Sequence, residues 1–267
     1  MRHEQRMVSG NKADKTGAMP KLEKDISMSN FQIKIAGLVI GINSKYEYVS
    51  RLCEEYKVSG DFSTGKVDFS VSATEQEILE EQAGSAGASL PYCESLCLYR
   101  AICLRLVPYD AFLMHSAALA LDGEAYVFAA KSGVGKTTHM KLWMDEFGER
   151  TQVINGDKPI YRFMDGALYA CGTPWQGKER LGSNIMVPVK AIYFLEQSAE
   201  NRIRLLGEGE VIGRIFHQLL MPREEEELDR FMDLIERMIT SVDCYLLSCN
   251  MEREAALLAY KRRGGVK

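Results

Sequence analysis

A glycine-rich segment in the middle of the chain, Ala130–Thr138, has the residue types that bind phosphate groups. It matches the pattern G-x-x-x-x-G-K-[ST] except that Ala130 replaces the first glycine. Gly133 and Gly135 let backbone N–H groups form an anion nest, and a surface lysine would reach the β- and γ-phosphates. The alternative is a glycine-rich turn without a ligand. The predicted nucleotide-binding residues are Ala130, Lys131, Ser132, Gly133, Val134, Gly135, Lys136, Thr137 and Thr138.

Asp157 is the candidate partner of Thr137 in holding a magnesium ion. It lies twenty residues after Thr137 and follows the predicted strand Gln152–Asn155. A magnesium ion at a phosphate loop needs a carboxylate from a neighbouring strand end. The alternative is an ordinary turn aspartate before Lys158, because aspartate is common in turns. We expect Thr137 and Asp157 to be the metal ligands.

Two apolar runs, His115–Leu121 and Glu124–Ala130, precede the phosphate loop and are joined by Asp122-Gly123, a strong hairpin signal. In that register, paired residue numbers sum to 245, so His115 faces Ala130 at the mouth of the loop. This placement predicts a role for His115 beside the transferred phosphate, against the alternative of a packed structural histidine. His139 and His217 are expected on helix surfaces.

The positioning elements follow from hydrophobic periodicity and from turn residues. A helix should follow the loop, with Met140, Trp143 and Phe147 on one face and Gly148 as its cap. A second hairpin is predicted at Asp165-Gly166. Other strands are predicted within Phe31–Ile42 and at Lys66–Ser72, Gln152–Asn155, Ile160–Phe163, Ala167–Cys171, Lys190–Glu196, Arg202–Leu206 and Cys244–Ser248. Other helices are predicted at Tyr92–Val107, Glu208–Met221, Glu224–Thr240 and Met251–Arg262, and loops at Gln82–Ser89 and Gly172–Leu181.

Composition excludes several classes of protein. The 267 residues, 46% hydrophobic and 26% charged, are typical of a folded domain, and the net charge of −4 argues against nucleic acid as a partner. No apolar run is long enough to span a membrane, and the N-terminus does not resemble a signal peptide. Seven cysteines without a CxxC pair indicate reduced thiols and a cytoplasmic protein. Cys93 and Cys97, one helical turn apart, are interpreted as buried thiols rather than a metal site.

The chain is expected to have three parts. Residues 1–27 lack hydrophobic periodicity and are predicted to be a flexible tail, with Met19 or Met28 as alternative starts. Residues 28–110 should form a small N-terminal α+β part that is rich in strands. Residues 111–263 should form an α/β domain with a mixed sheet and the phosphate loop.

Five motifs in this order, spread over about Phe31 to Tyr260, resemble a known family. They are Met114-His-Ser-Ala-Ala, Ser132-Gly-Val-Gly-Lys-Thr-Thr-His, Ile154-Asn-Gly-Asp-Lys-Pro, Gly172-Thr-Pro-Trp-Gln-Gly-Lys and Cys249-Asn-Met-Glu-Arg-Glu-Ala-Ala. The set is similar to the C-terminal domain of HPr kinase/phosphorylase, with its phosphoenolpyruvate-carboxykinase-like fold. It looks closest to the compact bacterial relatives without the full N-terminal domain, some of which phosphorylate a serine of lasso-peptide precursors.

The resemblance implies roles for single residues. Lys136 and Thr137 would hold phosphate and Mg²⁺, and Asp157 matches the second acid of the family's Asp-Asp pair. The first acid, which acts as the general base, falls on Gly156 here. Asp157 could then serve as both base and ligand, His115 could help, or phosphotransfer could be lost.

The segment Gly172–Leu181 aligns with a mobile loop over the acceptor site of the family. Lys178 and Arg180 would stabilise charge on the phosphoryl group, or would simply be solvated. The function expected is an ATP- and Mg²⁺-dependent kinase acting on a serine-type hydroxyl of a peptide or small protein. A nucleotide-binding regulatory or scaffold protein and a small-molecule kinase are the alternatives. A homo-oligomer and a reverse phosphorylase reaction both stay open.

Overall fold

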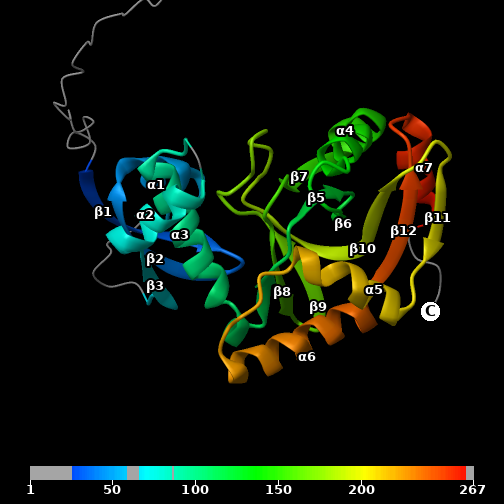
Figure 1. Cartoon of the computed structure of the whole chain (residues 1–267). Coiled ribbons are helices and arrows are strands. Elements are labelled where there is room, and N and C mark those ends of the chain that lie inside the picture. The colour runs from blue at the N-terminus through cyan, green and yellow to red at the C-terminus, as the bar shows by residue number, and fades with distance from the viewer. Residues whose placement is uncertain (1–25, 59–65, 86, 263–267) are drawn as a thin grey trace, which may run out of the picture.

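The computed structural model describes residues 26–58, 66–85 and 87–262, which form a small and a large β-sheet with helices. Figure 1 shows the small sheet and its helices beside the large sheet and the remaining helices. The predicted tail lies outside the described residues except for Ile26 and Ser27, which begin the first strand. The predicted α/β class with a mixed sheet is confirmed.

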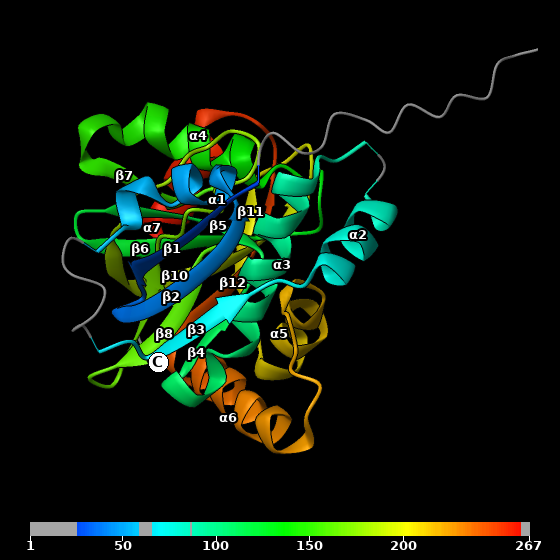
Figure 2. The same ribbon diagram turned by 90° about the vertical axis from the view of Figure 1, so that its left-hand side faces the viewer.

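The described residues between 26 and 104, here called the N-terminal unit, contain a three-stranded sheet and three α-helices (Figure 2). Strand β1 pairs antiparallel with β2 across the turn Ala36-Gly37, in which both residues have positive φ, and β3 pairs parallel with β2. Helix α3 packs its buried Leu98 and Ile102 into the core of this unit. The elements are β1 (Ile26–Ile35), β2 (Leu38–Tyr46), α1 (Glu47–Leu52), β3 (Phe69–Ser72), α2 (Glu75–Gly84) and α3 (Leu90–Leu104).

The loop predicted at Gln82–Ser89 is partly wrong, because α2 continues to Gly84. Thr74 and Glu77 form a capping box in which each side chain bonds the other's backbone N–H. Ile78 is the buried residue of α2. The sequence of this helix therefore has almost no apolar periodicity that could have predicted it. The start of this helix could have been predicted from its capping residues, but not from hydrophobic periodicity.

The large sheet has the strand order β4-β8-β9-β10-β6-β5-β7, with β12 on β10 and β11 on β12. The long strand β10 pairs with β9 near its start and then, further along, with β6 and β12. The strands are β4 (Ala111–Leu113), β5 (Ser116–Leu121), β6 (Glu124–Ala129), β7 (Thr151–Asn155), β8 (Ile160–Met164), β9 (Ala167–Cys171), β10 (Met186–Gln197), β11 (Arg202–Leu205) and β12 (Asp243–Cys249).

The predicted hairpin before the phosphate loop is confirmed. Strands β5 and β6 are antiparallel, and Ser116 pairs with Ala129, which is the expected register. Asp122 and Gly123 have φ values of 54° and 83°, as a two-residue turn between twisted strands requires. The hairpin at Asp165-Gly166 is confirmed in the same way between β8 and β9.

Helices cover both faces of the large sheet. Ala117 and Leu119 of β5 point to the core shared with α4 and α7, whereas Ala118 and Ala120 point to the core shared with α5 and α6. The helices are α4 (Lys136–Phe147), α5 (Glu208–Ile215), α6 (Glu225–Ser241) and α7 (Arg253–Lys261). None of the helices in the described ranges is both long and apolar enough to cross a membrane.

The helix predicted at Glu208–Met221 is too long. Helix α5 ends at Ile215, and a short 3-10 turn continues to Gln218. Leu219 then forms an antiparallel bridge with Met114, which requires extended backbone. This bridge brings the end of the 3-10 turn against the residue that precedes His115.

Candidate nucleotide site

The predicted phosphate loop joins the end of β6 to the start of α4. Gly133 and Gly135 have φ values of 83° and 118°, a region that glycine adopts without a side-chain clash. Gly135 is the N-cap of α4, so the first N–H groups of the helix have no helical acceptor. This strand, loop and helix arrangement is the backbone geometry that suits a bound phosphate.

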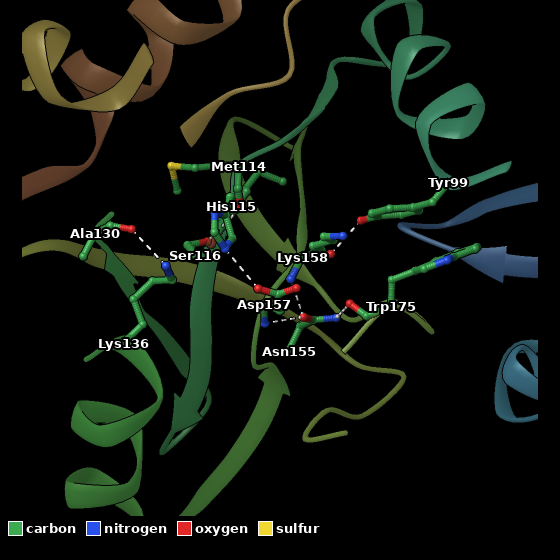
Figure 3. A network of polar contacts seen from close by, with 11 residues as sticks. Tyr99, Met114, His115, Ser116, Ala130, Lys136, Asn155, Asp157, Lys158 and Trp175 are labelled. Atoms are coloured by element: carbon green, nitrogen blue, oxygen red, sulfur yellow. Dashed lines mark hydrogen bonds and ion pairs between the residues drawn. The ribbon is translucent and has the colours of Figure 1, made fainter. Parts of the chain in front are cut away.

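Lys136 is buried rather than on the surface, which corrects the prediction. The residue is 8% exposed, and its Nζ donates a hydrogen bond to the carbonyl oxygen of Ala130 at 2.9 Å (Figure 3). Burial lowers the pKa of Lys136, while the charge of Asp157 acts in the opposite direction. Gln218, with its amide oriented to suit its neighbours, also donates to the Ala130 carbonyl at 3.2 Å. A second donor can therefore hold this carbonyl if Lys136 turns to an anion.

His115 and Asp157 form the central polar contact of the site. His115 Nε2 lies 3.0 Å from Asp157 Oδ1, and Figure 3 shows the pair beside Lys136. His115 stands one residue before β5, and its backbone N–H donates to Gln218 O at 2.7 Å. Asp157 follows β7, which lies on the far side of β5 from β6. The hairpin and β7 therefore bring two residues 42 positions apart into contact.

The charge state of Asp157 follows from its surroundings. Burial alone would raise the pKa of this carboxyl. The hydrogen bond and charge of His115, together with Lys158 and Lys136, outweigh burial and lower the pKa below its ordinary value. A carboxylate that stays ionised is suited to hold a cation or to accept a proton.

Asn155 is a site residue that the sequence analysis missed. Its buried Oδ1 accepts hydrogen bonds from the backbone N–H groups of Asp157 at 2.9 Å and Lys158 at 2.7 Å. Its Nδ2 donates to Thr173 Oγ1 at 2.9 Å and to the carbonyls of Thr173 and Trp175. One side chain thus ties the Asp157 turn to the segment after β9. The position of Asn155, two residues before Asp157, was the sequence feature that could have indicated this role, because asparagine side chains bond to backbone N–H groups in turns.

The first half of the predicted loop Gly172–Leu181 belongs to the core, which corrects the prediction. Thr173 and Trp175 are buried, and the Trp175 ring stacks on Tyr99 with centroids 4.2 Å apart. From Gly177 to Arg180 the loop is exposed, and it carries Lys178 and Arg180. Arg180 has a φ of 50°, in the left-handed region.

A cavity of about 920 Å³ collects most of the predicted site residues. Lys136 and Thr137 line it together with His115 and Asp157. It is also lined by Ser132, Gly133, Gly135, Thr138, Lys178 and Arg180. Ala130, Lys131 and Val134 instead line a second cavity of about 880 Å³, together with Ser132, Gly133, Gln218 and others. The predicted phosphate loop therefore lies between the two cavities and lines both of them.

The residues present fit a magnesium ion held partly by a nucleotide. A hydroxyl, from Thr137, and an ionised carboxylate, from Asp157, line one cavity, and both are oxygen donors of the kind Mg²⁺ prefers. Within the described ranges, no cluster of three or more His, Cys, Asp or Glu side chains is arranged to hold a metal. Magnesium at phosphate sites needs only one or two carboxylates besides phosphates and water.

Cys93 and Cys97 are both buried, as predicted.

A side chain at Gly156, where the resemblance would place an acid, would lie tight against one backbone oxygen. A Cβ at this position would lie 3.3 Å from Leu181 O and 3.5 Å from Gln176 O. Its own N–H already donates to Leu181 O at 2.8 Å. A side chain here would press against the loop of residues 176–181. The close contact with the Leu181 oxygen is therefore consistent with a glycine at position 156.

His139 is buried, so its predicted place on a helix surface is wrong, whereas His217 is exposed as expected. Trp143 Nε1 donates to His139 Nε2 at 3.1 Å, and the imidazole meets the Phe128 ring edge-on. The proton of the neutral ring is therefore on Nδ1. Burial lowers the pKa of His139 from 6.5 to about 4.

This burial predicts a pH dependence of stability. The histidine takes up a proton below pH 6.5 when the chain is unfolded but stays neutral down to about pH 4 when it is folded. Because the unfolded state binds more protons in this window, stability falls as the pH falls. Between about pH 7 and pH 5, wild type should lose about 2 kcal/mol more unfolding free energy than His139→Gln. Equal losses in urea titrations would contradict the assignment, and His217→Gln is the exposed control.

No protein-family model and no curated protein matches the chain. Among solved structures, the HPr(Ser) kinase/phosphatase from Coxiella burnetii is similar, with 10% sequence identity and a TM-score of 0.33. The similarity covers 56% of this chain and 91% of that chain. A similarity of this size leaves the function to be argued from the site itself.

Proposed function

We propose that this chain is an ATP- and Mg²⁺-dependent kinase of the HPr kinase type that phosphorylates a serine-type hydroxyl of a peptide or small protein. The observation that carries the proposal is the contact of His115 with Asp157 at 3.0 Å in the cavity that Lys136 and Thr137 also line. The residues proposed to bind phosphate and the carboxylate proposed as the base, whose pKa is lowered, therefore line the same cavity. An aspartate with only a structural role in a turn would not need a histidine, a lysine and a threonine beside it in one cavity.

Each residue has a defined task in the proposed reaction. Lys136 leaves the Ala130 carbonyl and binds the phosphates, and Thr137 and Asp157 would hold the magnesium ion. A bound Mg²⁺ would neutralise charge on the transferring phosphate. Asp157 accepts the proton of the attacking hydroxyl, and His115 holds that carboxylate ionised and in place. Lys178 and Arg180 supply positive charge from the exposed loop.

A nucleotide-binding protein without phosphotransfer is the second candidate. The observation that favours it is Gly156, where the family's first acid is missing and a side chain would meet Leu181 O. In this case Asp157 would hold the metal but accept no proton. The two candidates differ in whether the γ-phosphate leaves the nucleotide.

Labelled nucleotides test the proposal directly. Wild-type protein is incubated with Mg²⁺, candidate peptides or extract, and ATP labelled on either its γ- or its α-phosphate. The proposal predicts γ-label in acid-stable phosphoserine and no α-label in any acceptor. Nucleotide that binds but keeps its γ-label would favour the second candidate.

His115→Gln separates a catalytic from a structural histidine. The substitution removes the imidazole that holds Asp157 Oδ1. We expect kcat to fall by about 100-fold, the usual size of a proton-transfer contribution. The melting temperature should change little, because the imidazole is partly exposed. A variant that melts earlier and turns over normally would show that His115 is structural.

A further inference from the structure

The cavity at the proposed reactive centre extends to the N-terminal unit. Figure 3 places Asp157 between Lys136 on one side and Tyr99 of α3 on the other. The same cavity is lined by Tyr48 and Leu52 of α1 and by Tyr92 and Leu96 of α3. The pKa of Tyr92 is raised by burial first and then by charges that include Asp157. This wall, called here the α1–α3 wall, is therefore within electrostatic reach of the proposed base.

The α1–α3 wall is apolar and aromatic. Tyr92 is 44% exposed, while Tyr48, Leu52 and Leu96 are half-buried. The Ser95 hydroxyl that also lines the cavity donates to Tyr92 O at 2.7 Å, so its proton is already used. Among the described residues, α1 and α3 bring no charged side chain to the lining. Aromatic and aliphatic side chains are the groups that such a wall would bury favourably.

The α1–α3 wall is fixed to the reactive centre by polar contacts. Trp175 Nε1 donates to Ser95 O at 3.0 Å, and Tyr99 OH donates to Lys158 O at 2.6 Å. Lys158 follows Asp157 directly, so α3 is bonded to the turn that carries the proposed base. A wall and a base held in one arrangement need little ordering when a ligand binds.

The rest of the cavity has an excess of positive charge. The acids in its lining are Asp157 and Glu179, and Glu179 already pairs with Lys141 at 3.0 Å. In the proposed function, Lys136 binds the phosphates, and Lys178 and Arg180 face the transferring group. Lys158 has no task at the phosphates, so it is the base that opposes a basic residue of the ligand and favours an acidic one. The bases in the lining are Lys136, Lys158, Lys178 and Arg180.

We infer that the α1–α3 wall selects the acceptor, and that the acceptor is a peptide segment whose serine lies beside an aromatic or aliphatic residue and an acidic residue. This inference rests on the proposed kinase function. The apolar side chain packs against Tyr92 and its neighbours, the acidic one faces Lys158, and the serine hydroxyl reaches Asp157.

Serine peptides of equal length test this assignment with γ-labelled ATP and Mg²⁺. One carries leucine and aspartate beside the serine, a second glycine and aspartate, and a third leucine and lysine. The first should be phosphorylated with kcat/KM at least about tenfold above the others. Tyr92→Ala should raise KM for the first peptide about tenfold and leave kcat and ATP affinity unchanged, and Tyr92→Phe should restore KM. Leu79→Ala, on the exposed face of α2, is the control.

The failures of the two proposals are distinguishable. Equal use of all three peptides, or no effect of Tyr92→Ala, would overturn the acceptor assignment and leave the kinase standing. Calorimetry that shows ATP binding while no peptide is phosphorylated would overturn it as well, and would leave the nucleotide site standing. Absence of ATP binding would overturn both proposals.

Discussion

Replacing Lys136 with alanine should abolish ATP binding and leave the protein folded. The lysine Nζ donates only to the Ala130 carbonyl among the described residues, and Gln218 can satisfy that carbonyl without it. The loss of a buried cation from a phosphate site should cost at least about 3 kcal/mol, which is more than 100-fold in Kd. Calorimetric titration with ATP measures the loss, and circular dichroism checks the fold.

The pH dependence of binding gives a second readout of the same lysine. Because burial lowers its pKa, Lys136 loses its charge at a lower pH than an ordinary lysine does. ATP affinity should therefore weaken as the solution becomes alkaline, before ordinary lysines titrate. Lys190→Ala, which removes a lysine that pairs with Glu124, is the matched control. Unchanged affinity in Lys136→Ala would remove the phosphate-loop assignment.

Asp157→Asn should lower Mg²⁺-dependent turnover about 1000-fold, or roughly 4 kcal/mol in the barrier, while nucleotide binding without Mg²⁺ persists. The amide keeps the size of the side chain but removes the charge that His115, Lys158 and Lys136 stabilise. Binding of the nucleotide phosphates alone should not weaken, because a negative charge is lost near them. Turnover and affinity, measured with and without Mg²⁺, separate the two effects.

Asp165→Asn is the control for that variant. Asp165 lies exposed in the turn between β8 and β9 at a φ of 50°, which asparagine also tolerates. It should retain wild-type turnover. If Asp157→Asn also turns over normally, Asp157 is only a turn residue.

The features of the site that could be predicted from the sequence are those that depend on residues close together in the chain. The Asp122-Gly123 turn fixes the register of β5 against β6 as far as the Ser116–Ala129 pair. The ladder does not extend to the predicted pair of His115 with Ala130, because the His115 N–H donates to Gln218 O, but His115 still lines one cavity with Lys136. The loop itself follows from the spacing of its glycines, and its strand and helix flanks follow from periodicity. Each of these signals acts over a few residues, so it can be seen without the tertiary fold.

The remaining features depend on contacts between distant segments. Trp175 is buried because Tyr99, 76 positions away, stacks on it, and nothing near Trp175 in the chain predicts this. His139 is buried because Phe128 and Trp143 surround it, although its helical position resembled a surface one. Lys136 is buried, and its Nζ donates a hydrogen bond to the Ala130 carbonyl oxygen. Tertiary packing, not local preference, decides these positions.

The amounts of ADP and phosphoserine formed by wild type and Asp157→Asn test the central claim most directly. Both proteins are incubated with Mg²⁺, ATP and the serine peptide that carries leucine and aspartate, after calorimetry has shown that both bind nucleotide. Phosphotransfer predicts equal amounts of ADP and phosphoserine from wild type and almost none from the variant. Wild-type protein that binds ATP and forms neither product, or variant protein that forms both, would contradict the assignment of a kinase built on Asp157.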